Sequence, residues 1–166
     1  MRWEPGDEIE RTRFFQRVVY GPDLDSCHLW IGALVDDGYG RFWIARDGHQ
    51  IVVRPHRYAL AVELERGLDD NEVAMHRRCD NPLCVNTGDG DAFAAHVVLA
   101  SAAENMADMG RKGRGGGRWL WFGADRADRA ERARRSRAVR EAVLRYGWDQ
   151  HAIETALYDV AQGTLW

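Results

Sequence analysis

Three cysteines and one histidine in this chain have the residue types and the spacing of a tetrahedral zinc site. Cys79 and Cys84 are separated by four residues, Cys27 lies far upstream and His96 lies downstream. Cysteine sulfur and imidazole nitrogen are the usual ligands of structural zinc, and four of them complete its coordination. The chain has three cysteines in all, and in a reducing compartment such a set favours a metal over a disulfide. The sequence therefore predicts one structural Zn2+ on these four residues, with His28, next to Cys27, as the rival fourth ligand.

A second pair of residues has the chemistry of metal-assisted hydrolysis. His76 stands three residues before Cys79, and Asn105 follows His96 by nine residues. An imidazole with a pKa near neutral can remove a proton from water, and an amide oxygen can hold a hard divalent cation. This combination suits the hydrolysis of a phosphodiester. The spacing of His76 and Cys79 also allows His76 to be a zinc ligand; we favour the base, because His96 is available as the fourth ligand.

Six short segments surround these residues and occur in a defined order. In chain order they are RFF at 13–15, CHLW at 27–30, GYGRF at 38–42, HRYA at 56–59, HRRCDNPLCVN at 76–86, and NMADM at 105–109 with RKGR at 111–114. Each segment is weakly specific when it is taken alone. Together, over about 100 of the 166 residues, they resemble the small HNH endonucleases of the His-Me finger (ββα-metal) class.

The resemblance implies a role for several individual residues. His76 would be the general base that deprotonates the attacking water, and Asn105 would hold Mg2+ or Mn2+ near the leaving 3′ oxygen. A positive charge must also meet the charge that develops on that oxygen, and Arg41 is the first candidate for it, with Arg57 second. The products would be a 5′-phosphate and a 3′-hydroxyl on DNA.

The chain departs from the family pattern at two places. Many HNH enzymes have an acidic metal ligand just before the catalytic histidine; here that position is Met75, which leaves more of the metal binding to Asn105. The family also has a short link between the second cysteine and the zinc histidine, whereas residues 85–95 intervene here. We interpret them as a loop insertion that displaces His96 along the sequence but not in space. Both departures support an alternative function, a non-catalytic zinc-stabilised DNA-binding module, and RNA is an alternative substrate.

Length and composition suit one small domain with an appendage. The chain has 166 residues, of which 45% are hydrophobic, and a core of this size gains from a structural metal. The fold class that the resemblance implies is α+β, a ββα-metal core with a structural zinc and a C-terminal helical appendage. We expect a zinc-stabilised nuclease domain over 1–110, a basic glycine-rich linker over 111–123 and an Arg- and Ala-rich helical tail over 124–166. That tail would bind DNA or form a homodimer.

Charge is distributed unevenly along the chain. The net charge is −3, but residues 111–145 hold 12 basic and four acidic side chains, a local net charge of +8. Charge segregation of this kind favours a polyanionic partner, here double-stranded DNA. We expect backbone contacts from Arg111, Lys112, Arg114 and Arg118, where neighbouring glycines allow close approach. Of the 23 basic residues, 22 are Arg and one is Lys.

Turn residues and hydrophobic periodicity predict the local elements. Asp47-Gly48 is a hairpin turn signal, and Asp149 is a candidate N-cap of a last helix. We expect helices at 8–20, 56–66, 96–110 and 124–146, strands at 27–31, 39–45 and 50–54, and the β-hairpin of the finger within 72–87.

Membrane and export signals are not evident in the sequence. No apolar run reaches the roughly 18 residues needed to span a bilayer. The first residues, MRWEPGDE, do not form the apolar segment of a signal peptide. We therefore expect a cytoplasmic protein with no membrane partner.

Overall fold

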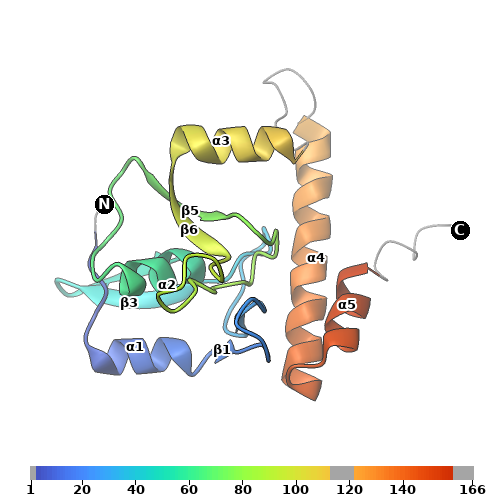
Figure 1. Ribbon diagram of the computed structural model, residues 1–166, viewed down its shortest axis with the longest axis horizontal. Helices are drawn as coiled ribbons and strands as arrows, with labels where there is room; N and C mark the ends of the chain where they lie inside the picture. Colours follow the sequence, from blue (N-terminus) through green and yellow to red (C-terminus); the bar gives the residue numbers. More distant parts are fainter. Residues whose placement is uncertain (1–2, 113–121, 159–166) are drawn as a thin grey trace, which may run out of the picture.

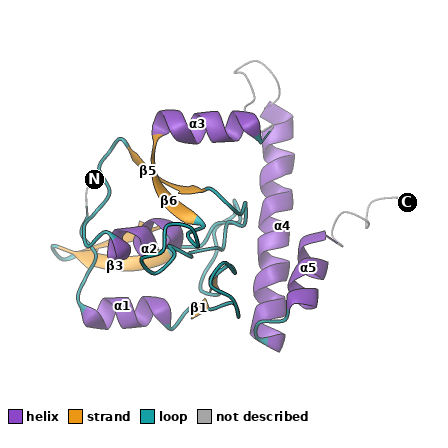
Figure 2. Ribbon diagram, in the orientation of Figure 1, coloured by secondary structure: helices purple, strands orange, loops and turns teal. Residues whose placement is uncertain are grey.

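The computed structural model describes residues 3–112 and 122–158. Short helices and short antiparallel strand pairs form the first of these ranges, and a long helix followed by a short one forms the second (Figures 1 and 2). The side chains of residues 122–128 and 158 lie outside this description. The elements are α1 (Glu8–Phe15), β1 (Val18–Val19), β2 (Leu29–Trp30), β3 (Phe42–Arg46), β4 (His49–Val53), α2 (Pro55–Glu63), β5 (Glu72–His76), β6 (Val97–Ser101), α3 (Ala102–Arg111), α4 (Phe122–Tyr146) and α5 (Gln150–Tyr158). The fold is therefore mixed α and β, with small antiparallel sheets.

Helix α1 begins at a side-chain cap and is shorter than predicted. The carboxylate of Asp7 accepts a hydrogen bond from the backbone N–H of Glu10 at 3.0 Å, which satisfies one of the free donors of the first turn. The prediction of a helix to residue 20 was wrong, because the helix ends at Phe15 and the chain then forms β1, which pairs with β2. Strand β2 is likewise shorter than the predicted 27–31.

The β3–β4 hairpin forms at the predicted turn. Asp47 and Gly48 both have positive φ, 52° and 77°, the backbone conformation of a two-residue turn that matches the twist of antiparallel strands. Phe42 pairs with Val53 and Arg46 pairs with His49. The alternation places Phe42 and Ile44 in the core and Trp43 on the exposed face.

An aromatic cluster joins these N-terminal elements. Phe14 of α1 has no exposed surface and lies 5.1 Å from Trp30 and 4.6 Å from Tyr58, measured between ring centroids. Phe42 lies 4.8 Å from Tyr58. Buried aromatic rings at these separations contribute both area and ring contacts to the core. The cluster fixes α1, α2 and the β3–β4 hairpin as one unit.

The strand that ends at His76 pairs with a strand that follows a long loop. Strand β5 pairs with β6, with Glu72 opposite Ser101 and His76 opposite Val97. The prediction of a hairpin within 72–87 was therefore wrong, and the predicted helix over 96–110 forms only from residue 102 onward. The run Val97–Ser101 is a strand, and α3 starts only after it, at a capping box in which Ser101 and Glu104 bond each other's backbone N–H groups.

Helices α4 and α5 form a hairpin that packs on the rest of the chain (Figure 1). Val139 and Val143 of α4 and Ile153 of α5 share one buried cluster with Leu29 and Leu83. The α4 and α5 ranges agree with the predicted helices, and the carboxylate of the predicted cap, at residue 149, accepts from the N–H of residue 152 at 2.8 Å.

Polar contacts also tie α4 to the N-terminal part. The Arg140 guanidinium donates to the carbonyls of Ile31 and Gly32 at 2.8 and 2.9 Å. A Cβ added to Gly38, which has a φ of +86°, would lie 2.9 Å from the Cα of Ala133. Such close approach of a loop to a helix requires glycine. Helix α4 is thus in direct backbone contact with the loop that precedes β3.

None of the helices in the part of the chain that the structure describes has the length and the apolar composition to cross a membrane.

Candidate metal centre and neighbouring base

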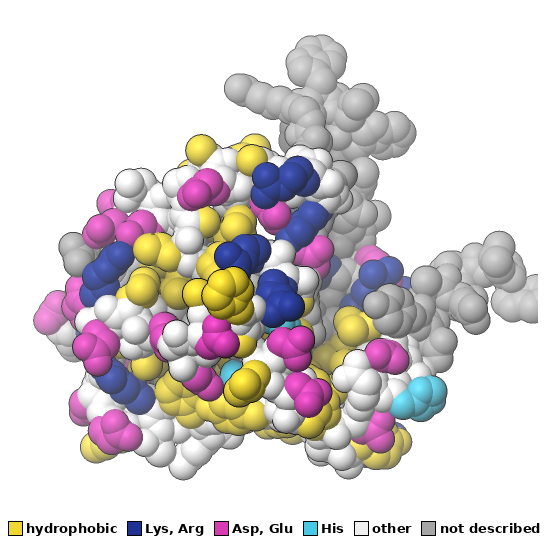
Figure 3. Space-filling model, viewed as in Figure 1, with side chains coloured by type: hydrophobic (Ala, Val, Ile, Leu, Met, Phe, Trp, Pro, Cys, Tyr) yellow, Lys and Arg dark blue, Asp and Glu magenta, His cyan; other side chains and the backbone are white. Residues whose placement is uncertain are grey.

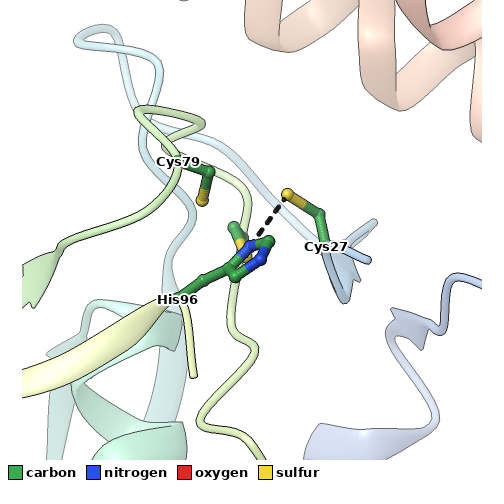
Figure 4. Close-up of side chains that lie close together, drawn as sticks. Cys27, Cys79 and His96 are labelled. Carbon is green, nitrogen blue, oxygen red and sulfur yellow. Dashed lines mark hydrogen bonds between the residues drawn. The ribbon is translucent and has the colours of Figure 1, made fainter. Parts of the chain in front are cut away.

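The three cysteines and His96 converge on one point. Their ligand atoms, three sulfurs and one imidazole nitrogen, all lie within 4.8 Å of one another. Sγ of Cys27 is 3.4 Å from Nδ1 of His96, and Sγ of Cys84 is 3.5 Å from the same nitrogen. Figure 4 shows Cys27, Cys79 and His96 pointing toward one another from separate segments of the chain. Cys84 and His96 are buried, and Cys27 and Cys79 are half-buried.

Asn86 brings His96 into this group in spite of the long loop before it. The Asn86 side chain is fully buried, and its amide donates to the carbonyl of Ser26 at 2.7 Å, one residue before Cys27. Its backbone carbonyl accepts from the N–H groups of His96 and Val97 at 3.1 and 2.8 Å. The loop formed by the inserted residues therefore begins and ends beside Asn86, so His96 is displaced along the sequence but not in space, as the sequence analysis expected.

Hydrogen bonds and burial shift the pKa values of the members of this group. Hydrogen bonds from the thiols of Cys27 and Cys84 lower the pKa of Cys79, so that one thiolate is favoured at this position. The Cys27 thiol donates to Cys79, which raises its pKa to about 12, and burial raises the pKa of Cys84. The hydrogen bond to Cys79 raises the pKa of His96. Three sulfurs and an imidazole this close share protons when no cation is present, and a divalent ion would replace those protons.

The donor set fits zinc. Cys3His is a usual ligand set of closed structural zinc sites, and the cluster can hold a metal such as zinc. His28, the rival ligand, is not in this group; its ring lies 4.6 Å from Tyr20, and its backbone carbonyl accepts from Val85 N–H at 2.8 Å. The geometry favours His96 as the fourth ligand.

His76 is attached to the metal group through the backbone. It is the last residue of β5, and its Nε2 lies 3.0 Å from the carbonyl oxygen of Cys84. A carbonyl oxygen has no proton to give, so Nε2 must be the donor, and in the neutral ring Nδ1 is left as an acceptor. His76 is not a member of the Cys3His group.

A second imidazole lies beside His76. The rings of His56 and His76 are 4.9 Å apart, and His56 is 6% exposed. Burial, followed by the charge of His76, holds the pKa of His56 well below its usual value. Its Nδ1 has no hydrogen-bond partner among the described residues. His56 is therefore a neutral group packed against the proposed base.

Asn105 lies on the helix that packs against the same hairpin. Helix α3 contacts both β5 and β6, and Asn105 is half-buried on it. The contact that the structure shows for its amide nitrogen is to Sδ of Met109, at 3.8 Å. Its neighbour one turn on, Asp108, is 9% exposed. The inward side of α3 thus carries two oxygen-bearing side chains, of which the sequence analysis had identified only Asn105.

The two arginines proposed to stabilise charge lie in different environments. Arg41 is exposed, and its backbone N–H donates to the carbonyl of Ala33 at 2.8 Å. Arg57 is half-buried in the first turn of α2, directly after His56, and its charge adds to the burial that lowers the pKa of His56. Arg57 therefore directly follows His56, whose ring lies 4.9 Å from that of the proposed base His76.

The basic residues predicted to contact DNA divide into three groups. Arg111 is exposed, with its side chain 72% accessible, and pairs with Asp108 at 3.5 Å. Lys112 turns inward and contacts protein oxygens instead. Arg114 and Arg118 lie outside the described residues. The i, i+4 spacing of Asp108 and Lys112 is a signal in the sequence that could have identified their ion pair.

A cleft of about 910 Å³ separates the metal group from the helical hairpin. One side of it is formed by Cys27, Cys79 and His96, and the other by residues of α4 and α5, among them Val139 and Ile153. The half-buried sulfurs therefore face a space that the C-terminal helices partly cover.

Comparisons of the chain with protein-family models, with curated proteins and with solved structures found no match. The likeness to HNH endonucleases accordingly depends on the six sequence segments and on the chemistry of the residues in them.

Proposed function

We propose that this chain is a metal-dependent DNA endonuclease of the HNH type. It hydrolyses a phosphodiester with His76 as the general base and leaves a 5′-phosphate and a 3′-hydroxyl. The Cys3His group holds a structural zinc, and a separate Mg2+ or Mn2+ at Asn105 takes part in the reaction.

The hydrogen bond between His76 and Cys84 is the observation that carries this proposal. The 3.0 Å contact from Nε2 to the Cys84 carbonyl selects the tautomer in which Nδ1 can accept a proton. It also fixes the ring against a backbone segment that the metal ligand anchors. A general base needs both a free lone pair and a fixed orientation.

The order of the surrounding elements supports the same assignment. Strand β5 ends at His76, β6 pairs with it, and α3 follows β6 and packs back on the pair. A hairpin followed by a helix is the arrangement that the family resemblance implies for the base and its metal ligand. The side-chain oxygen of Asn105 would hold the divalent cation, and Arg57 or Arg41 would stabilise the charge on the leaving oxygen. The cation, when bound, polarises the phosphate and stabilises the leaving oxygen.

Duplex DNA is the substrate that the charge distribution favours. Figure 3 shows Lys and Arg side chains near the C-terminal end of α3 and below it, among Asp and Glu. Not every arginine of α4 is free for phosphate, because the guanidinium groups of Arg132 and Arg140 donate to backbone carbonyls of the N-terminal part. The affinity for DNA would therefore come from the end of α3 and the basic segment after it, more than from the inward side of α4.

One observation favours a second function, a non-catalytic zinc-stabilised DNA-binding module. Met75 occupies the position where many HNH enzymes have an acidic ligand, and it is a core residue of β5 that is 9% exposed. A thioether is a soft ligand and does not bind a hard cation such as Mg2+. In this alternative the zinc group would support DNA binding without cleavage.

Plasmid cleavage separates the two functions. We expect the purified protein to nick or cut supercoiled DNA in the presence of Mg2+ and to lose this activity when EDTA is added. His76→Ala should abolish cleavage, whereas His49→Ala, which changes an exposed histidine at the start of β4, should leave it intact. End labelling of the products should find 5′-phosphates. DNA binding with no cleavage in either Mg2+ or Mn2+ would favour the binding module, and a matched RNA substrate tests the alternative nucleic acid.

A further inference from the structure

The single lysine of the chain sits at a position where four protein oxygens meet. Nζ of Lys112 lies 2.7 Å from Oδ2 of Asp108, 3.0 Å from the His76 carbonyl, 3.1 Å from Oδ1 of Asp80 and 3.4 Å from the Arg77 carbonyl. Its side chain is 24% exposed. All other 22 basic residues besides the histidines are Arg. A strong compositional preference for Arg is thus broken at one place only.

The geometry of this place explains the exception. An ammonium group is compact and directs three N–H donors tetrahedrally, so it can bond oxygens that converge from several directions. A guanidinium is planar and directs its donors outward in one plane. The oxygens around Lys112 come from a helix side chain, a loop side chain and two consecutive backbone carbonyls. An Arg at this position would reach too far and could not bond all of them.

Three functional segments are joined by these contacts. Asp108 belongs to α3, the helix of Asn105; Asp80 follows the metal-group residue Cys79; and the backbone carbonyl belongs to His76 itself. We propose that Lys112 is a positioning residue, which fixes the backbone of the base relative to the metal-group turn and to α3, and not a contact to DNA phosphate. The part of this proposal that concerns cleavage depends on the proposed nuclease function; the part that concerns the metal-group turn does not.

The test compares Lys112→Met and Lys112→Arg with a matched control. Arg145→Met removes a cation that also pairs with an acidic residue four positions away, Glu141 at 3.4 Å, but on the exposed surface of α4. Three quantities are measured on the zinc-loaded full chain: the cleavage rate at saturating protein, the Kd for duplex DNA without Mg2+ at several salt concentrations, and the rate of zinc release to a chelator.

We expect both Lys112 variants to lower the cleavage rate at saturation at least about 10-fold and to speed zinc release, with Kd changed less than about twofold. Arg145→Met should change neither the cleavage rate nor zinc release. The proposal is overturned if Lys112→Arg cleaves at the wild-type rate. It is also overturned if Lys112→Met flattens the slope of log affinity against log salt by about 0.9, the value for one phosphate contact, while cleavage at saturation is unchanged.

Asp80→Asn keeps the test decisive if Lys112→Met does not fold. It weakens one of the four contacts and leaves the ammonium in place, so we expect a smaller effect on both zinc release and cleavage, in the same direction. Zinc release at the wild-type rate in Asp80→Asn and in Lys112→Arg would overturn the proposal for the metal-group turn. If the wild-type protein cleaves no nucleic acid, the nuclease proposal fails, whereas the zinc-release measurements still decide the role of Lys112.

Discussion

The imidazole of His76 donates to the backbone carbonyl of Cys84 at 3.0 Å, so the proposed base is oriented by a residue of the metal group. Sγ of Cys84 faces the cluster and its carbonyl faces His76. A metal bound by the sulfur would therefore also hold the carbonyl in place. In the proposed reaction, this relationship would link a structural ion to a chemical step in which the ion has no direct part.

Zinc binding should depend on His96 and not on His28. We expect one zinc per chain in the wild-type protein and in His28→Ala, measured by elemental analysis after purification without chelator. His96→Ala should bind zinc more weakly, and Cys79→Ser should lose the fold of the central region, because structural zinc supplies on the order of 10 kcal/mol of folding free energy in small domains. Zinc-free wild-type protein, or zinc loss in His28→Ala alone, would contradict the assignment.

Zinc removal should stop cleavage even when Mg2+ is plentiful. The reason is the contact of His76 with the Cys84 carbonyl, which loses its support when the sulfur loses its metal. We expect protein stripped with a strong chelator to be inactive with Mg2+ alone and to recover when Zn2+ is returned together with Mg2+. His76→Ala should cleave at least about 100-fold more slowly, the usual scale for loss of a general base, and should retain one zinc. Loss of zinc from His76→Ala would instead identify His76 as a ligand.

The buried His56 should make stability depend on pH. Burial holds its pKa in the folded state well below the usual 6.5, so the unfolded chain binds the proton more readily. The stability that the protein has with His56 neutral is fully present above pH 6.5 and is lost as the pH falls from there toward the folded-state pKa. The limiting slope of the unfolding free energy is about 1.4 kcal/mol per pH unit for one proton.

Urea unfolding of the wild type and of His56→Phe, between pH 7 and pH 5 with zinc in excess, measures this effect. The unfolding free energy of the wild type should fall relative to that of His56→Phe as the pH falls, because Phe does not titrate. The subtraction removes the contributions of His28, His96 and the carboxylates, which both proteins share. Parallel curves would show that the pKa of His56 is the same in the folded and the unfolded state, and would contradict this prediction.

The metal group could be predicted from the sequence, because it depends on residue types. The pairing of distant strands could not be predicted in this way. The candidate ligands Cys79 and Cys84 are close in sequence, and their types alone indicate a metal. The pairing of β5 with β6 depends on the loop being closed by the buried Asn86, whose partners lie about 60 residues upstream. No local pattern encodes such a contact, so the strand at Val97–Ser101 was predicted as helix.

Helix α4 was predicted in its extent but not in its packing. Its inward positions include small and polar residues, Ala133 and Ser136, and Arg140, whose guanidinium bonds backbone carbonyls. A sequence pattern of this kind resembles a solvent-exposed basic helix, because the apolar stripe is short. The structure instead shows Val139 and Val143 buried with Leu29 and Leu83.

Removal of the C-terminal helices should therefore unfold the metal region as well as weaken DNA binding. The sequence analysis treated residues 124–166 as a tail separate from the domain over 1–110. If the tail were separate, truncation after about Gly115 would leave that domain folded. In the structure the same truncation would expose Leu29 and Leu83, and Leu83 immediately precedes the ligand Cys84. Fully burying a leucine side chain contributes roughly 1.5–3 kcal/mol, which is a large share of the stability of a small domain.

A point variant tests this without deleting charge. Val139→Ala removes two methyl groups from a side chain with no exposed surface and should lower the unfolding free energy by roughly 1–3 kcal/mol, with faster zinc release and an unchanged salt dependence of DNA binding. Leu144→Ala, at an exposed position of the same helix that is 53% accessible, is the control and should be nearly neutral. A truncated protein that folds, binds zinc and cleaves like the full chain would show that α4 and α5 are a dispensable appendage after all.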